Sequence, residues 1–155
     1  MAKNQKLSHK DVGAWVFKGN PDEVWDYFVE LADSGRKRGT VDDSGGWTLG
    51  STYRTELVQK GDLVALWITG SRLPGIHEIG VITGEVEETV IDDTYLIDLS
   101  RRNKPVNSVR FKTLLLKAYI PREDMKSDPA LSSCEQFRAP MITNPTYLTH
   151  DEVKP

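Results

Sequence analysis

The sequence contains few of the residues from which metal, redox and nucleophilic sites are built. Its 155 residues include a single cysteine, Cys134, which excludes an intramolecular disulfide and a zinc site made of cysteines. The three histidines lie far apart, without the spacing of metal ligands: His9, His77 and His150. The sequence also lacks a phosphate-binding loop and a dinucleotide fingerprint. We therefore expect a protein that is not an enzyme and that uses no metal or cofactor.

The sequence also lacks an excess of positive charge and a long apolar run. Lys and Arg number 20 while Asp and Glu number 23, so the net charge of −3 excludes nucleic-acid binding by bulk positive charge. A local basic cleft remains compatible with this charge. No apolar run approaches the length of a membrane span, and residues 1–6 lack the apolar core of a secretion signal. A cytoplasmic protein without a membrane partner is the resulting expectation.

The apolar pattern predicts one mixed α+β domain. Residues 1–12 are polar and are expected to be flexible, so the domain is expected to span residues 13–155. Branched and aromatic residues predict strands over 13–18, 62–69, 76–86, 94–99 and 106–119. Short helices are expected after Asn20, which fits an N-cap, over 52–59, and from Pro121. These elements predict a mostly antiparallel, barrel-like sheet flanked by two to three short helices.

One of the four tryptophans, Trp47, does not belong to a periodic apolar pattern that would place it in the core. Burial in the core is the simplest interpretation of the others: Trp15, Trp25 and Trp67. Trp47 follows two glycines in polar sequence, which predicts a loop. A large aromatic side chain in such a loop is typical of a platform on which a ring stacks. The alternative interpretation is that Trp47 anchors its own loop to the core.

Basic residues gather in the predicted loops. Arg36 begins a basic run before the Trp47 segment, Arg54 follows that segment, and Arg72 lies in the next turn. Arg101 lies between two late strands. A run of charges is usually a solvated face, but loops can also meet at one end of a sheet. Such a meeting would form a basic rim around an aromatic pocket, which suits nucleic acid.

Short motifs along the chain, taken in order, resemble the EVE family of the PUA-like group, to which the YTH domains also belong. They are Trp15–Pro21, Gly46-Trp47, Lys60–Asp62, Leu66–Thr69, Pro74–Ile76, Ile79–Val81, Val109–Phe111 and Leu148–Glu152. Each motif is short, and their shared order and spacing carry the resemblance. The resemblance implies a PUA-like fold and a non-catalytic reader that holds a modified base, methylated cytosine or adenine, in an aromatic cage.

The resemblance also implies which residues form the site. Candidate base-pocket residues are Trp47, Trp67, Leu73, Lys18, Asn20, Ser51 and Thr69. Candidate phosphate-binding residues are Arg54, Arg72, Arg101 and Arg36. EVE proteins typically follow the pocket tryptophan with Asn-x-x-Ala-Arg, whereas this chain has Ser51 in place of the asparagine and keeps Arg54. This departure leaves open which base is read, and whether the polymer is DNA or RNA.

Two other functions are compatible with the same residues. A protein-interaction or regulatory module on this fold, without a working base pocket, would agree with the acidic net charge and the replaced asparagine. A small enzyme acting on nucleosides or RNA is the weaker alternative, because no catalytic pair is visible. The expected partners of a reader are modified DNA or RNA, single-stranded or with a flipped base, and a nuclease or regulatory protein downstream.

Overall fold

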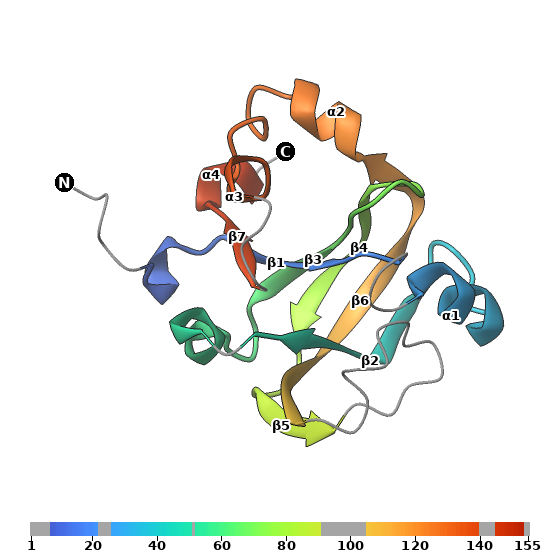
Figure 1. Cartoon of the computed structure of the whole chain (residues 1–155), viewed down its shortest axis with the longest axis horizontal. Coiled ribbons are helices and arrows are strands. Elements are labelled where there is room, and N and C mark those ends of the chain that lie inside the picture. Colours follow the sequence, from blue (N-terminus) through green and yellow to red (C-terminus); the bar gives the residue numbers. More distant parts are fainter. Residues whose placement is uncertain (1–6, 22–25, 51, 91–104, 140–144, 154–155) are drawn as a thin grey trace.

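The computed structural model describes residues 7–21, 26–50, 52–90, 105–139 and 145–153 (Figure 1). The strands are β1 (Ala14–Gly19), β2 (Val41–Leu49), β3 (Leu63–Ile68), β4 (Gly75–Ile82), β5 (Glu87–Val90), β6 (Pro105–Pro121) and β7 (Thr146–Leu148). The α-helices are α1 (Tyr27–Ser34), α2 (Arg122–Ser127), α3 (Glu135–Arg138) and α4 (His150–Val153). Two 3-10 helices complete the set, η2 (His9–Asp11) and η3 (Tyr53–Leu57). Among the described residues, no helix is both long and apolar enough to cross a membrane.

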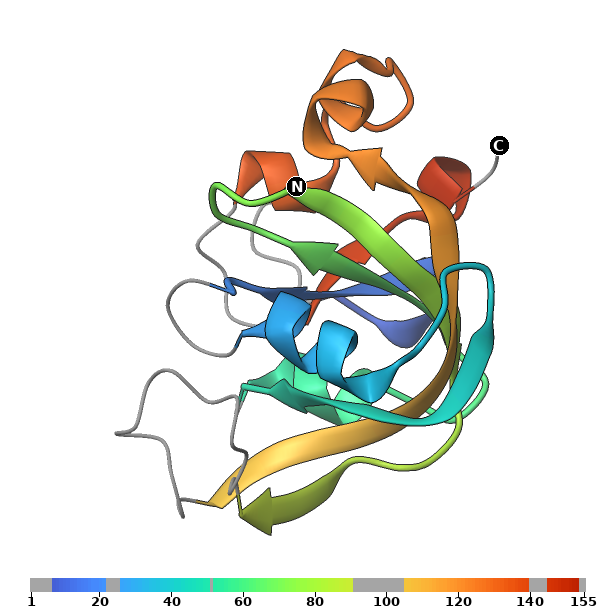
Figure 2. The ribbon, with the colours of Figure 1, turned by 90° about the vertical axis from the view of Figure 1, so that its right-hand side faces the viewer.

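The seven strands form one sheet in the order β2-β6-β4-β3-β1-β7, with β5 paired to β6. β1 and β3 are parallel, and the other pairs are antiparallel. The long strand β6 runs along much of the molecule and curves with it (Figure 2). Its register with β4 shifts between Ile76 and Glu78, which marks a bulge or irregularity in this pairing. The predicted α+β, mostly antiparallel sheet with a few short helices is confirmed.

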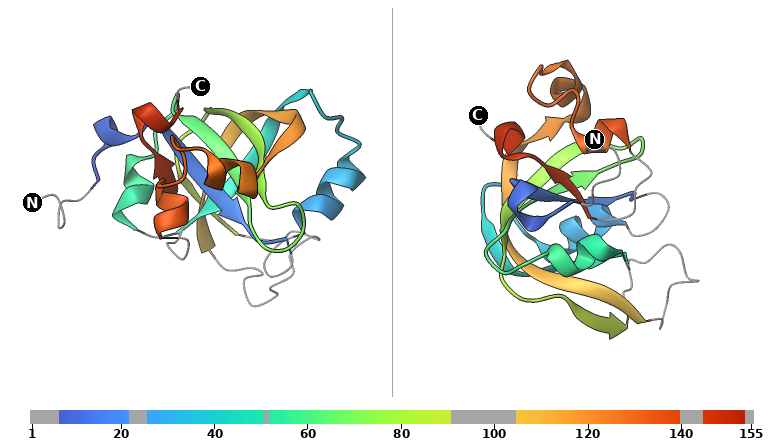
Figure 3. Two further views of the ribbon diagram at one scale, coloured as in Figure 1. Left: turned by 90° about the horizontal axis from the view of Figure 1, so that it is seen from above. Right: turned by 90° about the vertical axis from the view of Figure 1, so that its left-hand side faces the viewer.

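Two hydrophobic cores lie on opposite faces of this sheet, because successive side chains of a strand point to opposite sides. Trp15 and Phe17 of β1 belong to the first core, together with Trp47 and Phe111. The second core lies on the other face: Ala14, Val16, Ala65, Trp67, Ile76, Met125, Cys134 and Leu148. α2, α3 and α4 gather at one end of the molecule, apart from α1 (Figures 1 and 3). The strand register therefore decides which tryptophans share a core.

The segment that contains Trp47 is a strand, and the loop predicted there is wrong. β2 pairs with β6 and bulges between Asp42 and Gly45. Its glycines are required by close packing: a Cβ on Gly45 would lie 2.6 Å from the Phe111 ring, and one on Gly46 would lie 3.0 Å from the carbonyl oxygen of Val109. Glycine and polar residues therefore mark a closely packed strand here, although their composition indicates a loop.

Helix α1 begins later than predicted. Its N-cap is Asp26, whose carboxylate accepts a hydrogen bond from the Val29 amide at 3.2 Å. Asn20 is therefore not the cap of the helix that the structure describes. Gly35 ends the helix with φ 70°, a left-handed conformation that glycine adopts readily. Trp25 and the strand predicted over 94–99 lie outside the described residues.

The remaining elements follow the predictions more closely. β3 is a central strand between β1 and β4, and η3 falls inside the helix predicted over 52–59. The strand predicted over 76–86 ends at Ile82, and β5 follows as a separate strand. Of the segment 1–12, His9–Asp11 form η2, and the His9 Nε2 lies 2.8 Å from the Asp62 Oδ1. The domain bounds stay a prediction.

Candidate functional site

Trp47 joins strand β2 to the end of β1. Its side chain is 7% exposed, and its indole N–H donates a hydrogen bond to the carbonyl oxygen of Lys18 at 3.2 Å. The ring lies directly over Gly19, where an added Cβ would come within 2.9 Å of it. Tyr27 and Phe111 pack around it, with ring centroids 6.5 and 6.4 Å away. The indole is therefore held in one orientation beside the carboxyl end of β1.

The ends of β1 and β3 lie side by side because the two strands are parallel neighbours. The Thr69 amide donates to the carbonyl oxygen of Gly19 at 2.9 Å, and this bond extends the pairing past the end of β3. Gly70 follows with φ 93°, and a Cβ there would lie 2.8 Å from the Asn20 Oδ1. The structure thus places Asn20 and Thr69 at the same strand ends that Trp47 contacts through Gly19.

The loop between β3 and β4 is fastened to α1. Arg72 donates from Nη2 to the carbonyl oxygen of Pro21 at 2.9 Å and lies 3.3 Å from the Asp26 Oδ1. Its guanidinium lies 5.5 Å from the centroid of the Phe28 ring. Leu73, the next residue, is 50% exposed. Of the residues predicted to line the pocket, Leu73 has the most exposed side chain in the described part of the chain.

Trp67 and Lys18 are placed on the face opposite Trp47. The two residues are paired in the β1–β3 register. Trp67 is 1% exposed, and its ring packs edge-on against the Phe137 ring, with the centroids 5.3 Å apart. Burial lowers the pKa of the Lys18 ammonium group, against the charge of Glu135, which raises it. The structure therefore brings only the carbonyl of Lys18 to Trp47, through its hydrogen bond to the indole.

Two of the predicted phosphate-binding arginines are held by buried carboxylates. Both terminal nitrogens of Arg54 bond the carboxylate of Glu135, with Nη2 to Oε2 at 2.7 Å, and this bonding raises the pKa of Arg54. Arg36 donates to Glu78 at 2.6 Å and is 14% exposed. Arg72 is 41% exposed and therefore more accessible than either. Ser51 and Arg101 lie outside the described residues.

A buried polar network under α1 has no counterpart in the sequence predictions. Glu78 of β4 is 4% exposed and accepts from the hydroxyl of Tyr27 at 2.7 Å, from Arg36 at 2.6 Å and from the hydroxyl of Thr113 at 2.5 Å. Burial and the Glu78 charge raise the pKa of the Tyr27 hydroxyl. A glutamate inside the apolar run of β4 is the signal that indicates such a network, since a buried carboxylate needs partners.

His77 holds the same loop from inside the fold. Its ring is fully buried and stacks on Tyr119, with centroids 4.6 Å apart. The Nε2 lies 2.8 Å from the carbonyl oxygen of Leu73, so Nε2 carries the hydrogen and Nδ1 accepts from Arg38. Burial lowers the pKa of His77 below 6.5, and the positive charge of Arg38 lowers it further. The imidazole is therefore neutral at pH 7.

The free energy of unfolding should fall as the pH falls below about 6.5, and His77 should cause part of the fall. The unfolded chain then binds a proton at His77 that the folded chain does not, so acid favours unfolding. We expect the free energy of unfolding of His77→Gln to fall less between pH 7.5 and pH 5.0 than that of the wild type. Urea unfolding at both pH values measures it, with His150→Gln as the control. An unchanged pH dependence in His77→Gln would contradict the neutral assignment.

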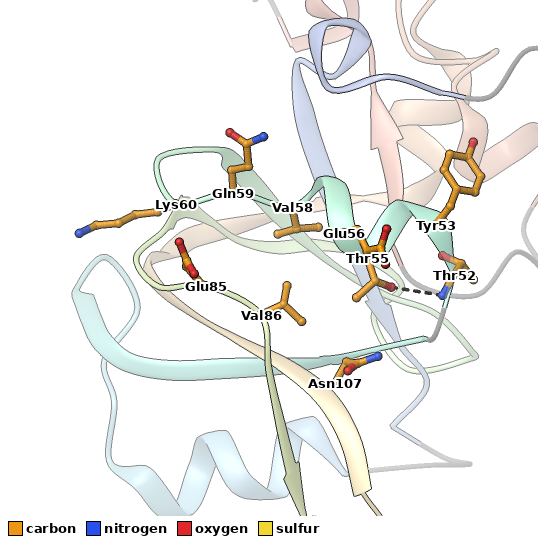
Figure 4. A pocket seen from close by; sticks show the side chains of 10 residues that line it. All are labelled: Thr52, Tyr53, Thr55, Glu56, Val58, Gln59, Lys60, Glu85, Val86 and Asn107. Atoms are coloured by element: carbon orange, nitrogen blue, oxygen red, sulfur yellow. Dashed lines mark hydrogen bonds between the residues drawn. The ribbon is translucent and has the colours of Figure 1, made fainter.

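Within the described ranges, no three His, Cys, Asp or Glu side chains are arranged to hold a metal ion. An open groove of about 940 Å³ runs between η3, the β4–β5 turn and β6 (Figure 4). Its lining is mostly polar: Thr52, Tyr53, Thr55, Glu56, Val58, Gln59, Lys60, Glu85, Val86 and Asn107. Of the predicted pocket residues that the structure describes, none lines this groove, and Trp47 and its neighbours at the strand ends are not among its lining residues.

No protein-family model matches the sequence, and no curated protein matches it. The structure is similar to a hypothetical protein from Leishmania major, with a TM-score of 0.59 and 13% identity over 93% of this chain and 91% of the other. It is also similar to the DUF55 domain of human thymocyte nuclear protein 1, with a TM-score of 0.55 and 15% identity over 90% and 93%. A structure of human THYN1 protein in complex with 5-methylcytosine-containing DNA matches with a TM-score of 0.53 and 14% identity over 92% and 99%. The chain therefore has the fold of the DUF55, or EVE, domain, as its sequence motifs predicted.

Proposed function

We propose that this protein binds nucleic acid by holding a modified base beside Trp47, where β1 and β3 end. One observation carries the proposal: the Trp47 indole is fixed at these strand ends by its N–H bond to Lys18 and by its packing on Gly19. A human protein of similar fold has been seen in complex with 5-methylcytosine-containing DNA. The surrounding residues offer both apolar and polar contacts. Asn20 and Thr69 supply polar groups, and Leu73 supplies an exposed apolar side chain.

Stacking alone does not decide the affinity of such a site. Flipping a base out of a duplex costs a few kcal/mol, and stacking on an aromatic ring returns roughly 1–3 kcal/mol. Contacts to the added methyl group and to the polar edge of the base must therefore supply the difference. Binding should be stronger to a base that is already unpaired, because the unpairing cost is then absent.

Arg72 is the described residue we propose for contact with a phosphate. It is the more exposed arginine at the site, and its guanidinium is already positioned by Pro21 and Asp26. Arg54 and Arg36 are fixed in carboxylate pairs, so we assign them to the architecture of the site. With few phosphate contacts and a net charge of −3, the affinity should depend only weakly on salt. Arg101 and Ser51 stay sequence-based candidates for the same site.

Replacing Trp47 with phenylalanine should weaken binding to the preferred modified oligonucleotide by about tenfold, because the larger indole face and its hydrogen bond are lost. Trp67→Phe is the matched control, since Trp67 is also buried, at 1% exposure against 7% for Trp47, but lies on the opposite face of the sheet. Fluorescence polarisation at low salt measures both variants against plain, 5-methylcytosine, 5-hydroxymethylcytosine and N6-methyladenine bases, in single- and double-stranded DNA and RNA. Equal affinity for modified and plain bases, or equal losses in both variants, would contradict the proposal.

A protein-interaction module remains the second candidate, and one observation favours it. Val41, Leu114 and Ile79 are neighbours on three adjacent strands, and Val41 and Ile79 are 57% and 42% exposed. Apolar side chains that adjoin on an outer sheet face are typical of docking surfaces. A pull-down that recovers one specific protein, unaffected by Trp47→Phe but abolished by Ile79→Lys, would favour this function over base binding.

A further inference from the structure

In the loop between β3 and β4, the Arg72 side chain is bonded to the rest of the protein while the Leu73 side chain is exposed. Arg72 is packed over Phe28 and bonded to the main chain of Pro21. Leu73, the next residue, has 50% of its surface exposed. Leaving the leucine side chain in water forgoes the stabilisation that its burial would give. Arg72 keeps 41% of its side chain exposed, so the loop directs both side chains at least partly towards the solvent.

The backbone of Leu73 is strained as well. Among the described residues it is the non-glycine residue with positive φ, at 45°. Leucine disfavours this region, and the residue before a proline, here Pro74, disfavours it further. A strained backbone persists only where the surrounding structure holds it, and such residues concentrate at functional positions.

The strained conformation is held from two sides. The buried His77 ring donates from Nε2 to the carbonyl oxygen of Leu73 at 2.8 Å. The amide of Arg122 donates to the carbonyl oxygen of Pro74 at 2.8 Å. These bonds fix the main chain of the loop while the Leu73 side chain stays exposed. The leucine is thus presented on a rigid support, which reduces the entropy lost when it contacts a partner.

Leu73 is close to the proposed base site. Thr69 is bonded to Gly19, on which the Trp47 ring lies, and Leu73 is only four positions after Thr69 in the chain. Four residues span at most roughly 14 Å. The loop lies on the same side of the molecule as α1 and the end of β1 (Figure 1). The exposed Leu73 side chain therefore belongs to the loop that directly follows the strand end at the proposed base site.

We propose that Leu73 is a wedge that enters the base stack of a duplex and fills the space left by the flipped base. Apolar side chains are used in this way by proteins that unstack DNA, because they keep the neighbouring bases from closing again. The inference rests on the proposed function and adds to it a preference: the wedge contributes to binding of duplexes but not of single strands. The sequence prediction that Leu73 is a wall of the pocket differs, because a wall contacts the base in both forms.

The test compares Leu73→Asn with the wild type on duplex and single-stranded DNA that each contain one 5-methylcytosine. Asparagine tolerates positive φ, so this variant keeps the backbone and removes the apolar side chain. We expect its melting temperature to be unchanged or higher, its duplex affinity to fall about tenfold, and its single-strand affinity to change less than twofold. Leu73→Met, which restores an apolar side chain, should recover most of the duplex affinity. The fluorescence of 2-aminopurine next to the modified base should rise less with Leu73→Asn than with the wild type.

The outcomes separate this inference from the function on which it rests. Equal losses on duplex and single strand identify Leu73 as a pocket wall and overturn the wedge, while base binding stands. Unchanged affinity for both forms also overturns the wedge alone. If the wild type prefers no modified base of the full panel over its plain counterpart, in DNA or RNA, the proposed function fails, and the wedge fails with it.

Discussion

Replacing Glu78 with alanine should remove about 3–5 kcal/mol of the free energy of unfolding, because it leaves the buried guanidinium of Arg36 without its carboxylate. Glu78 is 5% exposed in its side chain and is the acceptor for Tyr27, Arg36 and Thr113. These three residues come from α1, the following loop and β6. The loss should therefore loosen α1, which carries Tyr27 against Trp47.

Urea unfolding of Glu78→Ala and Glu78→Gln measures this contribution, with Glu123→Ala as the control. Glu123 also pairs with an arginine, Arg122, but its side chain is 78% exposed. An exposed pair of this kind contributes at most about 1 kcal/mol. Glu78→Gln should lose less than Glu78→Ala, because the amide oxygen still accepts two of the hydrogen bonds. A loss in Glu78→Ala no larger than in Glu123→Ala would show that the network is not buried as described.

Gly80→Ala should lower the free energy of unfolding by about 4 kcal/mol or more, or prevent folding altogether. A Cβ at this position would lie 1.9 Å from the carbonyl oxygen of Lys112 and 2.7 Å from the Thr113 Cα. Both contacts are with the main chain of β6, so no side chain can turn away to relieve them. Strands β4 and β6 would have to separate at the centre of the sheet, and the pairing of Gly80 with Thr113 would be lost.

Gly84→Ala is the matched control for this prediction. Gly84 follows β4 in the same chain segment, and a Cβ there meets no atom closer than 3.9 Å. Alanine at this position should change the melting temperature little. Soluble yield and thermal unfolding followed by circular dichroism compare the two variants. If Gly80→Ala and Gly84→Ala are equally stable, the close approach of β4 and β6 at Gly80 is wrong.

The two faces of the sheet explain why the aromatic residues were only partly interpretable from the sequence. The pattern predicted a buried strand over 62–69, and β3 is one. It did not show that Trp67 would face the second core while Trp47 faced the first, because that depends on register and on a strand where a loop was expected. The structure shows Trp47 anchored by its N–H to the carbonyl of Lys18. Its role as a platform for a base stays a proposal.

The sequence by itself determined the class of fold and the local elements whose causes are local. Branched and aromatic residues predicted β1 and β3, and a glycine able to adopt positive φ ended α1 at Gly35. The order and spacing of the short motifs predicted the EVE-like fold, which the structure and its solved neighbours confirm. These features depend on residues close together in the chain.

Only the tertiary structure decided which charged and aromatic groups meet. Arg36 and Glu78 are 42 residues apart, and Arg54 and Glu135 are 81 apart, so nothing local indicated that two predicted phosphate contacts would pair with buried carboxylates. The same holds for Leu73, whose exposure and strained φ are imposed by His77 and Arg72 acting on the loop. A side chain's partners depend on register and burial over the whole sheet, and these are properties of the folded chain alone.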